Sequence, residues 1–242
     1  MTRGIFLAGN ESVLFSAVAA ETEKRVEQYA AALIHGGNAA GSMAANASGS
    51  VTGGNANSVV KTGGGISGSS KGRIPLVWNP GSPVSNRTLI LSAENWLGRI
   101  NDALLVCSPP AMYKPAESLV PAEIETWINT QIKGWLYLVR ELAVYFRAKG
   151  GGTLVLAIPE TGSGGGESVS DLLGAPAAAS FRAMACELLL SAAVEPFQIL
   201  GFSFSEAGQE KDFAAWMFKI LDEGSKKYSG KWHKYGKFPL FK

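Results

Sequence analysis

Short apolar runs alternate with longer stretches of helical periodicity along most of this chain. Runs of five or six residues predict buried strands, whereas apolar residues spaced three and four apart predict amphipathic helices. The expected strands are Gly4–Ala8, Ile74–Asn79, Asp102–Cys107, Thr153–Ile158, Phe197–Phe202 and Ser229–Lys234. The expected helices run from Val13 to about Ile34, from Ser85 or Asn86 to about Leu97, from Pro121 to about Lys149, from about Ala175 to Leu190, and from Lys211 to Glu223.

The order of these elements predicts the fold class. A strand, a glycine-containing turn and a helix at the start of a chain are typical of a doubly wound parallel sheet. Strands that alternate with helices imply right-handed crossovers and a Rossmann-like three-layer α/β/α sandwich. At 242 residues the chain fits a single domain over 1–242 that is large enough to bury a full core.

Residues 35–72 differ from the rest of the chain. They are rich in Gly, Ser and Asn, and no Asp, Glu, Lys or Arg lies between Gln28 and Val60. This composition predicts a loop or linker, with 58–60 as a residual strand. We expect at least part of the segment to be held in place by the domain or by a partner, and one hypothesis is that it folds over a nucleotide pocket. A second distinct segment is the C-terminal tail, 235–242.

Charge and cysteine content narrow the function classes. A net charge of +2 argues against a nucleic-acid partner, because such proteins usually carry a dense basic face. The first apolar run is too short for a signal peptide or a membrane span. Cys107 and Cys186 lie in apolar surroundings, so we expect two buried free thiols, which suit a reducing cytoplasm.

Four local phrases resemble the short-chain dehydrogenase/reductase family. Leu97–Val106 resembles that family's approach to its fourth strand, and Ile132–Glu141 resembles its fifth helix. Tyr145–Val155 is similar to the end of that helix and the next strand, and Ser229–Trp232 to the start of the final strand. The resemblance covers nearly the whole chain outside the glycine-rich segment. It implies the family's nucleotide-binding fold and, in typical members, an NAD(P)-dependent dehydrogenase.

The cofactor positions of the family are poorly matched here. Gly9 matches the first glycine of the family's phosphate-binding turn, but the later two glycines fall near Val13 and Phe15. The Asn-Asn-Ala-Gly that lines the cofactor in the family corresponds to the run from Cys107 and Ser108 to Pro110. No residue of the glycine-rich segment matches the family's ribose-binding residue at the end of the second strand. The resemblance therefore predicts that this chain binds no NAD.

The catalytic positions of the family are also altered. The helix Asn corresponds to Gln131, and the Ser after the fifth strand corresponds to Pro159. The Tyr-x-x-x-Lys pair, a proton donor whose pKa is lowered by the lysine, corresponds to Gly174 and Ala178. No shift of this alignment restores the pair, because no Tyr, Lys or His lies between Gly150 and Glu210.

Other catalytic or metal chemistry finds little support. Neither glycine-flanked serine completes a Gly-x-Ser-x-Gly turn, and two separated histidines do not make a metal site. Two carboxylates flank the second glycine-rich loop, and we expect them to be solvated. The residues assigned structural or solvent-exposed roles on these grounds are Ser163, Ser203, His35, His233, Glu160 and Glu167.

The leading hypothesis is a catalytically degenerate subunit that scaffolds an active homologue. Members of the family assemble as dimers of dimers, and the resemblance implies a heterotetramer with NAD bound in the active partner. Such pairs occur in NAD-dependent hydroxyacyl-CoA dehydrogenases, including one of anaerobic toluene degradation. The long helix, the alanine-rich helix and the C-terminal elements would form the interfaces. Expected contact residues are Ala177, Ala178, Ala179, Ala183, Trp135, Tyr145, Phe146, Trp232, Tyr235, Phe238 and Phe241.

Two other hypotheses remain open. One is a stand-alone, homo-oligomeric binding or regulatory protein that uses the vacated cleft for a different ligand. The other is an enzyme with atypical catalytic residues, for which Glu160 or Asp171 would be the candidates. Measurable NAD(P) binding by the isolated chain would favour the enzyme.

Overall fold

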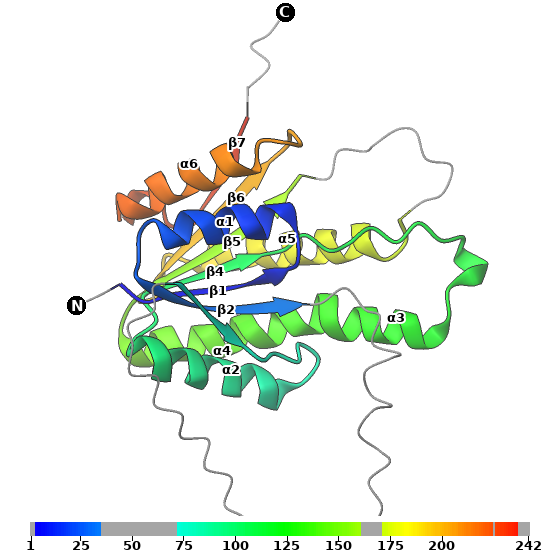
Figure 1. Cartoon of the computed structure of the whole chain (residues 1–242), viewed down its shortest axis with the longest axis horizontal. Coiled ribbons are helices and arrows are strands. Elements are labelled where there is room, and N and C mark those ends of the chain that lie inside the picture. Colours follow the sequence, from blue (N-terminus) through cyan, green and yellow to red (C-terminus); the bar gives the residue numbers. More distant parts are fainter. Residues whose placement is uncertain (1–2, 35–71, 161–170, 225, 237–242) are drawn as a thin grey trace, which may run out of the picture.

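A computed structural model of the chain describes residues 3–34, 72–160, 171–224 and 226–236. Seven parallel strands form one sheet in the order β3-β2-β1-β4-β5-β6-β7 (Figure 1). The chain winds from β1 through β2 to β3, then returns across β1 to begin β4, so the winding direction reverses between β1 and β4. This confirms the predicted doubly wound α/β fold. The strands are β1 (Ile5–Asn10), β2 (Gln28–Ile34), β3 (Gly72–Leu76), β4 (Asp102–Val106), β5 (Thr153–Pro159), β6 (Gln198–Phe204) and β7 (Lys231–Tyr235).

Helices cover both faces of the sheet and complete three layers (Figure 1). Helices α1 and α6 pack on one face, where they bury one hydrophobic cluster, and α2, α4 and α5 bury a second cluster on the other face. Ser12 caps α1 and Ser82 caps α2, each by accepting a hydrogen bond from a first-turn backbone N–H. The helices are α1 (Val13–Glu23), α2 (Pro83–Leu97), α3 (Pro121–Trp127), α4 (Gly134–Lys149), α5 (Gly174–Ser191) and α6 (Glu210–Asp222).

The predicted first helix, Val13 to Ile34, is wrong in its second half. Helix α1 ends at Glu23, and Gln28–Ile34 is strand β2, which pairs with β1 and β3. A central parallel strand is covered on both faces and forms a continuous apolar run, which periodicity alone does not distinguish from a buried helix. The second strand of the fold therefore precedes the glycine-rich segment. Residues 35–71, with the expected residual strand 58–60, lie outside the described residues.

Two other predicted elements need correction. The expected strand Ile74–Asn79 is β3, Gly72–Leu76, and the next helix begins three residues before Asn86 because Ser82 is its cap. The expected single helix from Pro121 to Lys149 is divided by a π turn at Ile128–Lys133. Such turns widen the helix by one residue and occur often at functional sites. Here the turn directs Gln131 into the protein.

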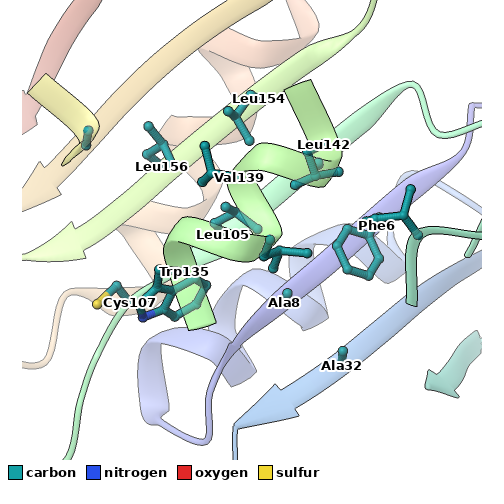
Figure 2. Packing of buried hydrophobic residues seen from close by; sticks show 14 of the residues in the cluster. Phe6, Ala8, Ala32, Leu105, Cys107, Trp135, Val139, Leu142, Leu154 and Leu156 are labelled. Atoms are coloured by element: carbon teal, nitrogen blue, oxygen red, sulfur yellow. The ribbon is translucent and has the colours of Figure 1, made fainter. Parts of the chain in front are cut away.

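The core beneath α4 holds aromatic residues that the sequence analysis assigned to an interface. Trp135, Tyr145 and Phe146 are buried within the chain's own core, so their predicted role as partner anchors is wrong. Figure 2 shows Trp135 within this core. Cys107 is fully buried in the same cluster, as predicted. Cys186 is exposed on α5, because it points away from the sheet, and its predicted burial is also wrong.

A network of charges joins the elements at the amino ends of the strands. Arg3 bonds both Asp102, at the start of β4, and Asp222, at the end of α6. Arg25, just beyond α1, bonds Asp222 at 2.9 Å and Glu21 at 2.6 Å. We call these five residues the amino-edge ion network. Because it links β1, β4, α1 and α6, it fixes the two helices of this face against the sheet.

Candidate functional site at the crevice between β1 and β4

The point where the winding reverses is the place to look for a ligand. In open α/β sheets, ligands bind beyond the carboxyl ends of the strands at this reversal. Here it lies between the end of β1, at Asn10, and the end of β4, at Val106. The first turn of α1 and the π turn before α4 contribute residues on either side. We call this region the β1–β4 crevice.

At the α1 side of the crevice, an aromatic ring packs directly on the strand. A Cβ placed on Gly9 would lie 2.7 Å from the Phe15 ring and 2.6 Å from the carbonyl oxygen of Val106. Phe15 is 3% exposed and belongs to the core, whereas Val13 is 69% exposed at the helix start. The two residues near the family's later glycine positions thus differ: Phe15 fills space against the strand, and Val13 faces solvent. Gly9 is required by the packing of Phe15.

A buried amide pair spans the crevice. The Asn10 side chain donates from Nδ2 to Gln131 Oε1 at 2.7 Å and accepts at Oδ1 from the backbone N–H of Ser108 at 2.9 Å. Asn10 is 1% exposed and Gln131 is 2% exposed. The contact joins β1 to the π turn, and the second bond joins β1 to the segment after β4. Sequence reasoning placed Gln131 and Ser108 near this site but missed Asn10, whose signal is a polar residue at the end of an apolar strand.

Gly174, which the sequence resemblance matches to the family's tyrosine, has no room for a side chain. A Cβ on Gly174 would lie 2.3 Å from Asp171 Oδ2 and 2.8 Å from the carbonyl oxygen of Pro110. The Asp171 carboxylate accepts hydrogen bonds from the backbone N–H groups of Gly174 and Met112, at 2.8 and 3.0 Å. These bonds hold the start of α5 against the segment after β4. Asp171 therefore acts structurally at this point.

Two other residues that the resemblance matches to catalytic positions, Pro159 and Ala178, are small or apolar. Pro159 ends β5, and Ala178 is buried on the inner face of α5. One turn further along α5, the Phe181 ring packs edge-on against Trp135 at 5.0 Å, and Trp135 packs edge-on against Trp78 at 5.8 Å. Among the described residues, Trp135 Nε1 is the one buried side-chain nitrogen or oxygen without a hydrogen-bond partner. An aromatic cluster therefore fills the floor beside the crevice.

Charged side chains gather further along the carboxyl ends of the strands, around Glu160. Glu160 Oε1 accepts from Ser203 Oγ at 3.0 Å and lies 3.2 Å from Lys234 Nζ and 3.5 Å from Arg182 Nη2. Trp232 donates from Nε1 to Ser203 Oγ at 2.9 Å, and its ring lies 4.9 Å beneath the Arg182 guanidinium. Burial alone would raise the pKa of Glu160, but the bonds from Lys234 and Ser203 lower it below its ordinary value. We call these five residues the carboxyl-edge cluster.

This cluster corrects the expectation of a solvated Glu160. It also shows that Ser203 is buried and satisfied on both sides, as its predicted structural role requires. His233 points to the opposite face of β7, where Nε2 lies 3.1 Å from the Tyr228 carbonyl oxygen. Three other residues considered from the sequence, His35, Ser163 and Glu167, lie outside the described residues.

Among the described residues, the side chains that span the crevice offer little acid–base chemistry. Asn10, Gln131 and Ser108 do not titrate near neutral pH, and burial raises the pKa of the Cys107 thiol well above its ordinary value. Within the ranges that the structure describes, no group of three or more His, Cys, Asp or Glu side chains could hold a metal ion. A search of the same ranges for a helix long and apolar enough to cross a membrane also finds none.

Comparison with known proteins identifies the fold. No protein-family model and no curated protein matches the sequence. A short-chain dehydrogenase from Mycobacterium smegmatis is 15% identical with a TM-score of 0.66, over 98% of this chain and 93% of that one. A metagenomic short-chain oxidoreductase in complex with NADP is 10% identical with a TM-score of 0.65, over 99% and 98% of the two chains.

An NADH-dependent reductase complexed with NAD is also 10% identical, with a TM-score of 0.65 over 96% of this chain and 94% of that one. These likenesses extend over almost the full length of both chains in each pair. At such low identity they bear on architecture alone. The chain has the fold of the short-chain dehydrogenases/reductases.

Proposed function

We propose that this protein is a non-catalytic member of the short-chain dehydrogenase/reductase family that scaffolds an active homologue in a cytoplasmic hetero-oligomer. The observation that carries the proposal is at Gly174, which the sequence resemblance matches to the family's catalytic tyrosine. A side chain there would collide with the Pro110 carbonyl oxygen at 2.8 Å, a backbone atom that does not swing aside. A tyrosine at this position would therefore require the backbone after β4 to move, which supports the proposed absence of the family's catalytic pair.

The residues of the crevice also fit a dinucleotide poorly. Phe15 packs on Gly9, where the family's turn brings backbone close to the pyrophosphate, and the Asn10–Gln131 pair crosses the crevice. We therefore propose that NAD is bound by the active partner and not by this chain. A chain of this fold that binds no NAD would contribute to the complex through the surface that contacts the active partner.

The outer face of α4 and α5 is the surface we assign to the partner. These helices cover the same face of the sheet, and their outward side chains include exposed apolar residues that no element of the described chain covers. Ala177 and Ala178 face the core, so only Ala179 and Ala183 of the predicted alanine-rich contact surface are exposed. Exposed apolar side chains at an interface core favour association. We call this surface the α4/α5 face; it comprises Leu136, Val144, Ala179, Ala183 and Leu190.

The sequence resemblance favours one setting for such a subunit. It is an NAD-dependent hydroxyacyl-CoA dehydrogenase of the kind found in anaerobic toluene degradation, in which active and degenerate subunits form a heterotetramer. The likeness to solved dehydrogenases supports only the coarser part of this proposal, the fold. The partner class is testable directly, because an active homologue would carry an intact Tyr-x-x-x-Lys pair.

The two cysteines of the chain, which differ in exposure, provide the test. Cys186 is exposed on α5 and Cys107 is buried, so a maleimide should label Cys186 alone in the isolated chain. We expect co-expression with an intact homologue from the same operon to give a hetero-oligomer in which Cys186 is protected. A chain that remains homo-oligomeric beside that homologue, with Cys186 fully reactive, would contradict the proposal.

A matched pair of variants tests the face itself. Leu136 on α4 is 50% exposed and Leu91 on α2 is 51% exposed, so the two differ in position and not in burial. Leu136→Asp should abolish assembly because it places a charge in the interface core, whereas Leu91→Asp should leave it intact. Equal effects of the two variants would assign the interface elsewhere.

One observation favours the alternative, a homo-oligomeric binding protein. The carboxyl-edge cluster holds an ionised Glu160 between Arg182 and Lys234 at the ligand-binding edge of the sheet. A ligand found there in a homodimeric preparation would support that alternative. The third hypothesis, an atypical enzyme, is weakened at Asp171, because backbone N–H groups already engage its carboxylate.

A further inference from the structure

The buried hydrogen bond between the Asn10 and Gln131 side chains has no role in the proposed assembly, yet it is short and almost fully shielded from water. It joins residues 121 positions apart in the sequence at 2.7 Å, and both side chains are at least 98% buried. Asn10 uses its second polar atom to hold the Ser108 backbone N–H. Burying two amides is unfavourable unless they bond to each other, so the contact needs an explanation.

We propose that the Asn10–Gln131 bridge is an internal latch that closes the β1–β4 crevice with the chain's own side chains, in place of a bound dinucleotide. The inference rests on the proposed function and deepens it, because it states how the crevice is kept shut in a subunit that does not bind the nucleotide.

Three elements meet at this latch. Asn10 ends β1, Ser108 follows β4, and Gln131 projects from the π turn that precedes α4. The Asn10 side chain therefore holds the end of β1 to the segment after β4 and also to the π turn before α4. Phe15 adds a second closure on the α1 side by packing on Gly9. Ligand binding at this point would require breaking bonds that water cannot replace while the site stays buried.

The latch also controls access to a buried thiol. Cys107 immediately precedes Ser108 and is fully buried in the cluster that contains Trp135, one helical turn beyond Gln131 (Figure 2). Burial raises the pKa of the Cys107 thiol, so the closed form holds it as the unreactive thiol. Opening the crevice would release both the Ser108 segment and the π turn. The labelling rate of Cys107 therefore reports opening of the crevice.

The experiment measures that rate in a Cys186→Ser background, in which Cys107 is the only thiol. We expect slow labelling of the parent chain under native conditions. Asn10→Ala should accelerate labelling by about tenfold or more, since a buried polar group left unpaired favours the open form. Gln131→Met removes the acceptor while preserving length and apolar packing, and it serves as the second variant should Asn10→Ala fail to fold. Both changes together should add little to either alone.

The control is a variant at the amino edge of the sheet whose melting temperature is similar to that of the latch variants. Asp222→Asn weakens the amino-edge ion network without touching the crevice, so it should leave local labelling of Cys107 slow. Acceleration equal to that of the latch variants would mean that labelling follows global unfolding, and it would overturn the latch. Rapid labelling of the parent chain would do the same.

Failure of the latch and failure of the scaffold role give different results. Reversible binding of NAD(H) or NADP(H) by the parent chain, without turnover and with normal hetero-oligomer formation, would overturn the latch and the proposed absence of bound NAD, but it would leave the scaffold role intact. Slow Cys107 labelling in a chain that never associates with a homologue would overturn only the assembly proposal.

Discussion

The amino edge of the sheet and the β1–β4 crevice use polar residues in opposite ways. At the amino edge, Arg3, Arg25 and Asp222 join helices to strands through charge pairs. At the carboxyl edge, around the β1–β4 crevice, the polar contacts are made by neutral amides, Asn10 and Gln131. Charge persists where it supports packing and is absent from the crevice, where an enzyme of this fold would need a proton donor. On the proposed function, this contrast reflects a chain that keeps the fold while residues of its crevice pack as core.

The largest expected effect on the free energy of unfolding comes from truncating Phe15, a crevice residue that is buried in the core. Phe15→Ala should lower the free energy of unfolding by about 3 to 5 kcal/mol, because it removes a buried ring that packs on Gly9. Val13→Ala, two residues away and exposed, should change it by less than about 0.5 kcal/mol. Urea denaturation followed by circular dichroism measures both. Similar values for the two variants would contradict the assignment of Phe15 to the core.

The second prediction concerns whether replacing Gly174 stabilises or destabilises the protein. Gly174 opens α5, and helix propensity alone predicts that Gly174→Ala stabilises the protein by up to about 1 kcal/mol. Because the new Cβ would meet the Pro110 carbonyl oxygen and the Asp171 carboxylate, we expect destabilisation by about 1 to 3 kcal/mol instead. Thermal unfolding distinguishes the two signs, and stabilisation would show that the tyrosine position has room.

The amino-edge ion network should contribute less and depend on pH. Burial opposes ionisation of Asp222, but hydrogen bonds from Arg25 and Arg3 lower its pKa below the ordinary value of 3.8. A depressed pKa in the folded protein stabilises it above the ordinary value, and that contribution is lost as pH falls through the folded pKa. Asp222→Asn should therefore cost about 1 kcal/mol at neutral pH and almost nothing in strong acid. Equal costs at both pH values would contradict this assignment.

The smallest effect should come from the carboxyl-edge cluster. Glu160→Gln removes the charge that faces Lys234 and Arg182 but retains an acceptor for Ser203. Since these pairs are partly exposed, we expect a loss of about 0.5 kcal/mol that disappears in high salt. Unfolding measured at low and high ionic strength tests this. A loss larger than that of Asp222→Asn would reverse the comparison between the two edges.

The comparison also shows what the sequence could and could not predict. The strands at Asp102–Val106 and Thr153–Pro159 are bounded by turn residues, so their apolar runs were assigned correctly. Strand β2 was missed because its buried run, Tyr29–Ile34, follows a helix with little punctuation. The π turn was missed because its backbone bonds leave no clear sequence signal.

The site divides in the same way. The absence of a Tyr-x-x-x-Lys pair between Gly150 and Glu210 can be read directly from the sequence, because this window lacks both residue types. The partner of Gln131 could not be predicted, since Asn10 lies 121 residues away and meets it only through the folded sheet. Likewise, Trp135 looked like an interface residue because apolar side chains on a long helix do not reveal which face is covered.

The most direct test of the central claim is a calorimetric titration of the purified chain with NAD⁺, NADH, NADP⁺ and NADPH, with an intact short-chain dehydrogenase as the positive control. If the crevice is filled by Phe15 and closed by Asn10 and Gln131, no binding heat should appear for any of the four nucleotides. Saturable binding of any one of them by the unmodified chain would contradict the account.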